Sequence, residues 1–434
     1  MTGGKRNGWR VHVLVLALAG QVVPATGATP ESVTIPLKVV NIPGVGVKVG
    51  IEVGLGGGPP RLYTFDTGSS GMYAAYNAAW WPALQQLGGQ PIPQEYGSGL
   101  QLEANRVSTL VTIPTDQGPI TYTAEVGQIT QASGTSDGEQ WLANVAAGKP
   151  PLYGMFFGDF GSGLTKPAQG LFAVLPQLPG NLSSGFAVQL GCGGGSPESK
   201  VVVGLTTPLR SRVTSWVKME KLEGGPPFPN SNYPTYRQAV FNGHFSLKRD
   251  SHVFDFTLPA ILDTGGGTTD IHQQDKGTDT LVVPDAFLVQ PGAEDTPIVS
   301  GTQFRVTAPG TGGSNDFDLA FLTGTTATID EVKASKAKNT NNKLPMPEVN
   351  LALIPFFRYD VVFDVEQGKV GFAPCTAAVA PTAPIPVLSS WVTVLLAASL
   401  AIFGAFAAGM RGVPPSRRVR APARDARERT GRGA

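Results

Sequence analysis

A short pattern that joins an apolar run to a tight turn occurs twice in this chain. It reads Phe-Asp-Thr-Gly-Ser-Ser-Gly at residues 65–71 and Leu-Asp-Thr-Gly-Gly-Gly-Thr at residues 262–268. Each copy follows an apolar run typical of a strand, and the two copies lie almost half the chain length apart. A strand-and-turn unit repeated at this spacing predicts two similar lobes that face each other.

Glycine and proline interrupt the chain throughout, with 55 glycines and 37 prolines among 434 residues. Neither is tolerated well inside a helix, which argues against a helical bundle or solenoid. Between them, apolar and polar residues alternate in short runs, as in Val-Lys-Val-Gly-Ile-Glu-Val at residues 47–53, and this indicates strands. We expect strands at residues 33–40, 47–53, 61–65, 106–113, 119–126 and 256–262, a helical stretch at residues 74–87 and an exposed loop at residues 331–348.

The two ends of the chain differ from the part between them. Residues 1–28 have basic residues, an apolar run and small residues, the order typical of a secretory signal. Residues 391–410 form an uncharged apolar stretch long enough to span a bilayer as a transmembrane helix, and the Arg-rich residues 411–434 follow it as a cytoplasmic tail. We therefore expect everything before residue 391 to be exported, with residues 377–390 as an Ala/Pro-rich stalk. The exported part is acidic, so nucleic acid is not an expected partner.

Taken together, these features predict an all-β protein with an N-terminal lobe at residues 29–208 and a C-terminal lobe at residues 209–376. Hydrophobic residues make up 41% of the chain, which supplies a packed core. The two cysteines and the few histidines do not have the spacing of a zinc site, so neither a metal nor a cofactor is expected.

Three patches of the sequence resemble the pepsin-like aspartic peptidases. The first is residues 65–71, to which residues 262–268 correspond in the second lobe. The second, Tyr96-Gly97-Ser98-Gly99, looks like the flap hairpin of that family, and residues 354–374 are similar to its closing strands. The resemblance covers most of residues 36–376. It implies a bilobal fold with the active site in the cleft between the lobes.

The resemblance assigns a role to each residue of the two turns. Asp66 and Asp263 are the expected catalytic dyad, because two adjacent carboxylates share one proton and can act as base and acid. Thr67 and Thr264 are expected to lock the turns together, while Gly68 and Gly265 allow the sharp turns. Ser69 is expected to hydrogen-bond the carboxylate of Asp66, so that the shared proton resides on Asp263. Tyr96, Gly97 and Ser98 are the expected flap residues that contact substrate.

The expected activity is that of an exported, monomeric endopeptidase that cleaves an extended polypeptide with water activated by the dyad. The bilobal fold would also bring Cys192 and Cys375 together, and we expect one disulfide between them. The second lobe has Gly266-Gly267 where the family usually carries a hydroxyl residue. A pepsin-like surface protein that binds without cutting is therefore the alternative.

Two further resemblances are present. The stretch from Asp263 to Asp270 is also similar to a phosphate loop of actin-like and chaperone-type ATPases, although export and the scarcity of helices count against that function. Residues 385–391, Ile-Pro-Val-Leu-Ser-Ser-Trp, look like the IPTL-CTERM sorting signal of Gram-negative bacteria, with Val387 in place of its usual threonine. That signal implies a membrane sorting protease as a partner. A plain membrane anchor is the other interpretation, and both place the protein in the cell envelope.

Overall fold

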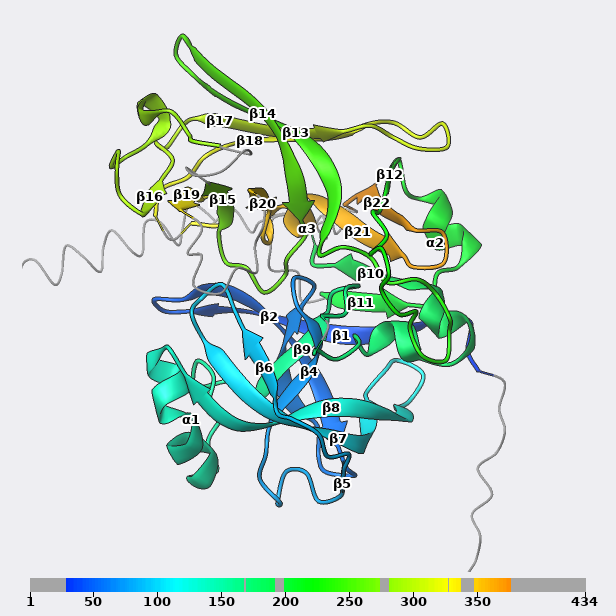
Figure 1. Ribbon diagram of the computed structural model, residues 1–434. Coiled ribbons are helices and arrows are strands. Elements are labelled where there is room, and N and C mark those ends of the chain that lie inside the picture. Colours follow the sequence, from blue (N-terminus) through cyan, green and yellow to red (C-terminus); the bar gives the residue numbers. More distant parts are fainter. Residues whose placement is uncertain are drawn as a thin grey trace, which may run out of the picture. The chain divides into compact units, whose positions relative to one another are not determined.

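The computed structural model describes residues 29–167, 169–191, 199–273, 281–326, 328–336 and 347–375. Within these residues the chain is built mainly of strands, arranged in two sheets (Figure 1), so the predicted all-β class is confirmed. The predicted signal, stalk, sorting motif, membrane span and basic tail lie outside them. No helix in the described part of the chain is long and apolar enough to cross a membrane.

The larger sheet unites strands that are distant in the sequence. Near its middle, β1 (Val33–Ile42) pairs with β11 (Lys200–Val203), and β21 (Tyr359–Asp364) pairs with β10 (Gly185–Gln189); in Figure 1 these are the blue, green and orange strands. In spatial order the sheet consists of β12 (Ser215–Lys218), β22 (Lys369–Pro374), β21 (Tyr359–Asp364), β10 (Gly185–Gln189), β11 (Lys200–Val203), β1 (Val33–Ile42), β2 (Gly46–Leu55), β3 (Arg61–Asp66), β9 (Gly158–Ser162), β4 (Ser70–Ala75), β8 (Ile120–Ser133), β7 (Gln101–Ile113) and β5 (Gln85–Gln86), with β6 (Ile92–Glu95) paired to β7.

The smaller sheet is formed by the second half of the chain. Its spatial order is β16 (Asp295–Pro297), β19 (Val332–Lys336), β15 (Thr269–Gln273), β20 (Glu348–Asn350), β14 (His252–Ile261), β13 (Ala239–Arg249), β17 (Gln303–Ala308) and β18 (Phe317–Leu322). The helices of the described residues are α1 (Ser136–Ala146), α2 (Thr207–Ser211) and α3 (Ile354–Arg358), with short 3₁₀ turns at Leu175–Gln177, Gly180–Ser184 and Asp285–Phe287.

Aromatic side chains pack the two sheets against each other. The ring of Phe317 on β18 stacks on that of Phe372 on β22, with 3.8 Å between the centroids. Phe241 on β13 meets both rings edge-on. Since all three side chains are buried, the hydrophobic core continues from one sheet into the other.

In each half, the strand that enters Asp-Thr-Gly and the strand that leaves it are separated by a third, inserted strand. β9 runs parallel to β3 and antiparallel to β4, and β20 does the same between β14 and β15. The registers correspond residue by residue. Asp159 of β9 lies opposite the residue two before Asp66, and Asn350 of β20 lies opposite the residue two before Asp263. The repeat seen in the sequence is therefore a repeat of this three-strand unit, with Asp159 and Asn350 at equivalent places.

Two of the predicted elements are wrong. Residues 74–87 do not form a helix: β4 continues to Ala75, and the N–H groups of Trp80 and Trp81 then turn back onto the carbonyl oxygen of Asn77. The two indole rings are buried, so packing decides the local structure there. Residues 331–348 are not wholly an exposed loop either, because residues 332–336 form β19, which pairs with β15 through buried Val332 and Ala334.

The close packing of β9 against β4 predicts that one added methyl group on β9 destabilises the fold. A Cβ at Gly161 would lie 2.6 Å from the carbonyl oxygen of Gly71 and under 3 Å from two more backbone atoms of the neighbouring segment. Gly161→Ala should therefore push β9 away from β4 and lower the free energy of unfolding by ~1–3 kcal/mol. A Cβ at Gly97 meets nothing within 4 Å, so Gly97→Ala should change stability by less than about 0.5 kcal/mol. Urea unfolding of both variants measures this, and equal midpoints would contradict it.

A second prediction concerns the cysteines. Cys375 is disulfide-bonded, whereas Cys192, the other cysteine of the chain, lies outside the described residues. The bond Cys192–Cys375 remains our prediction. It would close a loop of roughly 180 residues, which on the chain-entropy model stabilises the fold by ~5 kcal/mol before strain. Thiol titration of the oxidised, unfolded chain should find no free thiol, and two reactive thiols per chain would contradict the pairing.

Candidate active site

Two threonine hydroxyls join the Asp-Thr-Gly turns. Thr67 Oγ1 donates to the carbonyl oxygen of Leu262 at 2.7 Å and accepts from the N–H of Thr264 at 3.0 Å. Thr264 Oγ1 donates to the carbonyl oxygen of Phe65 at 2.6 Å and accepts from the N–H of Thr67 at 3.1 Å. Both threonines are buried. The structure therefore places them as a reciprocal pair, and each turn is held by the side chain of the other.

Two side chains from outside the Asp-Thr-Gly turns also bind the backbone of these turns. Lys48 Nζ on β2 donates to the carbonyl oxygen of Gly265, and Gln238 Nε2 just before β13 donates to that of Gly68. The two contacts are equivalent in position but differ in charge. Asp263's turn faces a cation, whereas Asp66's turn faces a neutral amide. Neither Lys48 nor Gln238 stands in a motif that the sequence could have revealed.

The glycine of each turn packs against the opposite carboxylate. A Cβ at Gly68 would lie 2.4 Å from Cγ of Asp263, and one at Gly265 would lie 2.5 Å from Cγ of Asp66. Only glycine leaves room for such an approach, and the two carboxyl groups come within hydrogen-bond contact of each other. The structure thus brings Asp66 and Asp263, which are almost half a chain apart in sequence, into one site.

Backbone N–H groups bind both carboxylates in the same way. Asp66 Oδ1 accepts from the N–H groups of Gly68 and Ser69, at 2.7 and 3.1 Å. Asp263 Oδ1 accepts from those of Gly265 and Gly266, at 2.7 and 2.9 Å. Gly266 therefore takes the place of Ser69 as far as the backbone is concerned.

The inserted strands make the two halves of the site unequal. Asn350 Nδ2 on β20 donates to Asp263 Oδ2 at 2.6 Å. At the equivalent place on β9, Asp159 presents a carboxylate, which accepts from the hydroxyl of Ser69 at 2.6 Å. The hydroxyl of Ser69, expected to hydrogen-bond Asp66, thus donates to Asp159, and Ser69 binds Asp66 only through its N–H. Asp159 and Asn350 were not found from the sequence because neither belongs to an Asp-Thr-Gly motif.

The different surroundings of Asp66 and Asp263 indicate which of the two carboxyl groups carries the shared proton. Burial raises the pKa of Asp66 well above its ordinary value, and the nearby charges of Asp263 and Asp159 raise it further. Each carboxylate accepts two backbone N–H groups, but only Asp263 also accepts from a side-chain amide, that of Asn350. We therefore expect the proton on Asp66 and not, as the sequence suggested, on Asp263. The earlier expectation assumed a hydroxyl on Asp66 that the structure gives to Asp159.

The residues predicted to form the flap lie in the turn of a hairpin. Tyr96, Gly97, Ser98 and Gly99 link β6 to β7, and the N–H of Gly99 donates to the carbonyl oxygen of Tyr96. Gly97 and Ser98 are exposed at the tip. The Tyr96 hydroxyl points inward and donates to Asp159 Oδ2 at 3.1 Å. The hairpin is thereby tied to the same side chain that holds Ser69.

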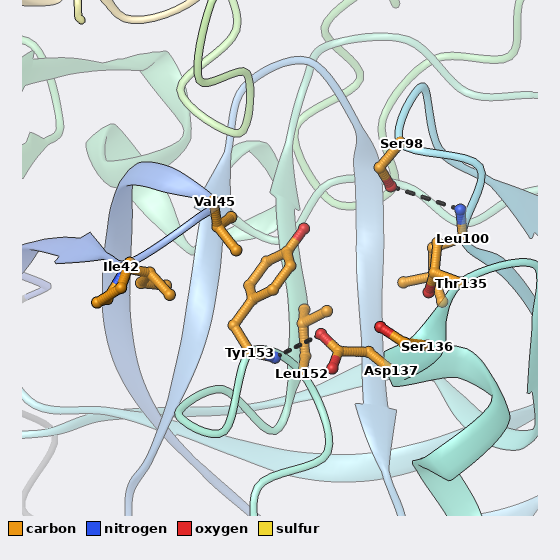
Figure 2. Close-up of a pocket in the computed structure, with 10 residues that line it drawn as sticks. Ile42, Val45, Ser98, Leu100, Thr135, Ser136, Asp137, Leu152 and Tyr153 are labelled. Carbon is orange, nitrogen blue, oxygen red and sulfur yellow. Dashed lines mark hydrogen bonds between the residues drawn. The ribbon is translucent and has the colours of Figure 1, made fainter. Parts of the chain in front are cut away.

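A hollow of about 290 Å³ lies beside this hairpin. Figure 2 shows the ring of Tyr153 standing in it, with the Asp137 carboxylate accepting from the Tyr153 N–H at 2.8 Å. Lys48 Nζ lies 5.5 Å from the centre of the Tyr153 ring, which links the hollow to the turn of Asp263. The wall of the hollow contains both apolar and polar residues, which are Ile42, Pro43, Val45, Ser98, Leu100, Thr135, Ser136, Asp137, Leu152 and Tyr153. Asp66 and Asp263 are not part of it.

In the part of the chain that the structure describes, no group of three or more His, Cys, Asp or Glu side chains is arranged to hold a metal ion. The N–H groups of both turns are already donated to the carboxylates of Asp66 and Asp263. The chemistry that the residues themselves offer is that of a singly protonated carboxyl pair.

The reciprocal threonine pair predicts a specific cost for losing one hydroxyl. Thr264→Val would leave the N–H of Thr67 and the carbonyl oxygen of Phe65 buried without partners, which should lower the free energy of unfolding by about 2–3 kcal/mol. Thr264→Ser keeps the hydroxyl and removes one methyl group, at a cost of about 1 kcal/mol. Urea denaturation compares the two, and a valine variant as stable as the serine variant would show that the hydroxyl is dispensable.

Comparison with known proteins leaves the chain without an assigned family. No protein-family model matches it, and no curated protein was found to be similar to it. What this chain does must therefore be inferred from the geometry of the two turns and the residues around them.

Proposed function

We propose that this protein is an aspartic endopeptidase, similar in fold and mechanism to the pepsin-like family. The observation that carries the proposal is the contact between the Asp66 and Asp263 carboxyl groups, held by the reciprocal threonines and by a glycine on each side. Two buried carboxyl groups at this separation cannot both be ionised, so one proton is shared. A pair in that state contains a base and an acid side by side.

The different surroundings of the two carboxyl groups support a different role for each. Ionised Asp263, supported by Asn350 and two N–H groups, accepts a proton from the attacking water. Protonated Asp66 donates a hydrogen bond to the carbonyl oxygen of the peptide bond and stabilises the negative charge that develops there. The water oxygen bonds to the carbonyl carbon as Asp263 takes its proton. Asp263 then gives this proton to the nitrogen as the C–N bond breaks, which leaves Asp66 protonated and Asp263 ionised as before.

The substrate would be an extended polypeptide. The flap hairpin offers a glycine and a serine at its exposed tip, and the mixed hollow beside it could receive a side chain next to the bond that is cut. The backbone of an extended substrate can pair with the strand edges of the flap hairpin, which makes binding largely independent of the substrate sequence.

The alternative of a protein that binds without cutting rested on Gly266-Gly267. Asp263 lacks a neighbouring hydroxyl, but the amide of Asn350 donates to it at 2.6 Å and performs the same task. The glycines therefore give no reason to expect an inactive site. The ATPase alternative is weakened too, because the N–H groups that would bind phosphate are donated to the carboxylates of Asp66 and Asp263.

We also propose that the protein acts outside the cytoplasm. The support is in the sequence: the signal at residues 1–28, the apolar residues 391–410, the basic tail and the resemblance of residues 385–391 to a bacterial sorting signal. Removal of the C-terminal segment by a sorting protease would release the protein into the envelope, whereas a plain anchor would keep it on the membrane.

The dyad is tested by amide substitutions. Asp66→Asn and Asp263→Asn should each reduce kcat/KM for an unfolded protein substrate by about 10³-fold, because one carboxyl group cannot serve as both base and acid. Cleavage should be followed from pH 3 to 7 with and without pepstatin. Asp255→Asn, which changes an exposed carboxylate on β14, is the control and should leave the rate unchanged. If either dyad variant cleaves as fast as the control, the aspartic mechanism is wrong.

A further inference from the structure

A third carboxyl group, that of Asp159, is buried at the dyad and has no role in the steps above. Its side chain is 3% exposed and accepts hydrogen bonds from three hydroxyl groups. Thr64 Oγ1 donates to Oδ1 at 2.6 Å, and Ser69 Oγ and the Tyr96 hydroxyl donate to Oδ2 at 2.6 and 3.1 Å. These donors come from β3, from the turn of Asp66 and from the flap hairpin, so one side chain connects all three.

A carboxylate is an unusual choice for this place. Burying a charge is costly, and the equivalent place in the other half holds Asn350, which fits the same backbone register without a charge. A residue needed only to fill space or to accept hydrogen bonds could be an amide here too. The negative charge is therefore the property that distinguishes Asp159.

We propose that Asp159 is a positioning residue of the active site, which ties the flap tyrosine to the turn of Asp66 and, as an anion, keeps the shared proton on Asp66. This inference rests on the proposed function. It adds a third acidic residue to a site in which the mechanism needs two. It also gives the asymmetry of the dyad a structural source.

The groups that face Asp159 are mostly acids. They are Asp66 and Asp263 of the dyad, and Tyr73, Tyr96 and Tyr153 from β4, the flap and the turn before β9. The cations nearby are directed elsewhere: Arg106 acts on Tyr73, and Lys48 binds the turn of Asp263. Burial raises the pKa of Asp159 to about 6, against the opposing effect of its three hydroxyl donors.

The sign of the effect follows from these charges. Above about pH 6 Asp159 is ionised, and a nearby negative charge makes Asp66 hold its proton more tightly. The dyad then stays singly protonated to a higher pH than it would alone. Activity should therefore extend toward neutral pH, and removal of the charge should shift the alkaline limb of the rate profile to lower pH.

The test compares Asp159→Asn with the parent enzyme on an unfolded protein substrate from pH 3 to 8. The amide has nearly the same shape and keeps one acceptor for the hydroxyl groups. We expect kcat/KM near pH 4.5 to stay within about threefold of the parent and the alkaline limb to move down by about one pH unit, giving a loss of about tenfold at pH 7. Profiles that overlay over the whole range would overturn the proposal.

Tyr96→Phe separates the two parts of the role. It removes the hydrogen bond of the flap to Asp159 but keeps the Asp159 carboxyl group beside Asp66, with its donors Thr64 and Ser69. Loss of one of three donors raises the pKa of Asp159, so this variant should raise KM at every pH and move the alkaline limb by clearly less than Asp159→Asn does. If it shifts the limb as Asp159→Asn does, then the flap, and not the charge, governs the proton on Asp66, and the proposal fails in that part.

Thermal unfolding gives a readout that does not depend on cleavage. Because the pKa of Asp159 is raised to about 6 in the folded protein, the folded state binds this proton more tightly than the unfolded chain does, and the stability it confers is lost as pH rises from about 4 to 6. The Tm of Asp159→Asn relative to the parent should therefore rise across that window. A constant Tm difference would contradict a buried, titrating Asp159. A parent that shows the Tm effect but cleaves nothing would refute the peptidase and leave the buried charge established.

Discussion

The site depends on the two hydroxyls of Thr67 and Thr264, each of which bonds the backbone of the opposite turn. Two buried carboxylates repel each other, and nothing in their own chemistry would keep them in contact. The threonine pair fixes the backbone of both turns, and the glycines next to them leave space for the carboxyl groups to meet. Two carboxyl groups in this contact are expected to share one proton, as the proposed mechanism requires.

The two halves of the site have one backbone plan but different charges. In each, an inserted strand separates the strands before and after Asp-Thr-Gly, with the same register. Side chains at equivalent places nevertheless differ, with Asp159 against Asn350 and Gln238 against Lys48. Asp159 makes the surroundings of Asp66 more negative, whereas Asp263 has a neutral amide at the equivalent place. The same backbone plan in both halves thus holds two carboxyl groups in different surroundings, and this difference is the basis of the proposed division into acid and base.

The sequence allowed the two turns, the hairpin turn at residues 96–99 and six of the strands to be predicted, because each depends on residues close together in the chain. The hairpin at residues 96–99 has a glycine-rich turn between alternating runs, and such local patterns carry their own geometry. The expected helix at residues 74–87 failed because burial of Trp80 and Trp81 outweighs local preference. Asp159 could not be assigned either, since its importance depends on a strand register with residues some ninety positions earlier.

Gly266 shows why a departure from a motif has to be judged in three dimensions. On the sequence, the missing hydroxyl beside Asp263 suggests a weakened site. In the structure a Cβ at Gly266 would lie 2.9 Å from Asp263 Oδ2 and 3.1 Å from the Ala352 side chain, so a larger residue would crowd the carboxylate that Asn350 already binds. The glycine and the asparagine therefore belong together, since the small residue leaves room for a donor from β20. In the first half the donor lies in the turn and the acceptor on the inserted strand: the Ser69 hydroxyl donates a hydrogen bond to Asp159 on β9.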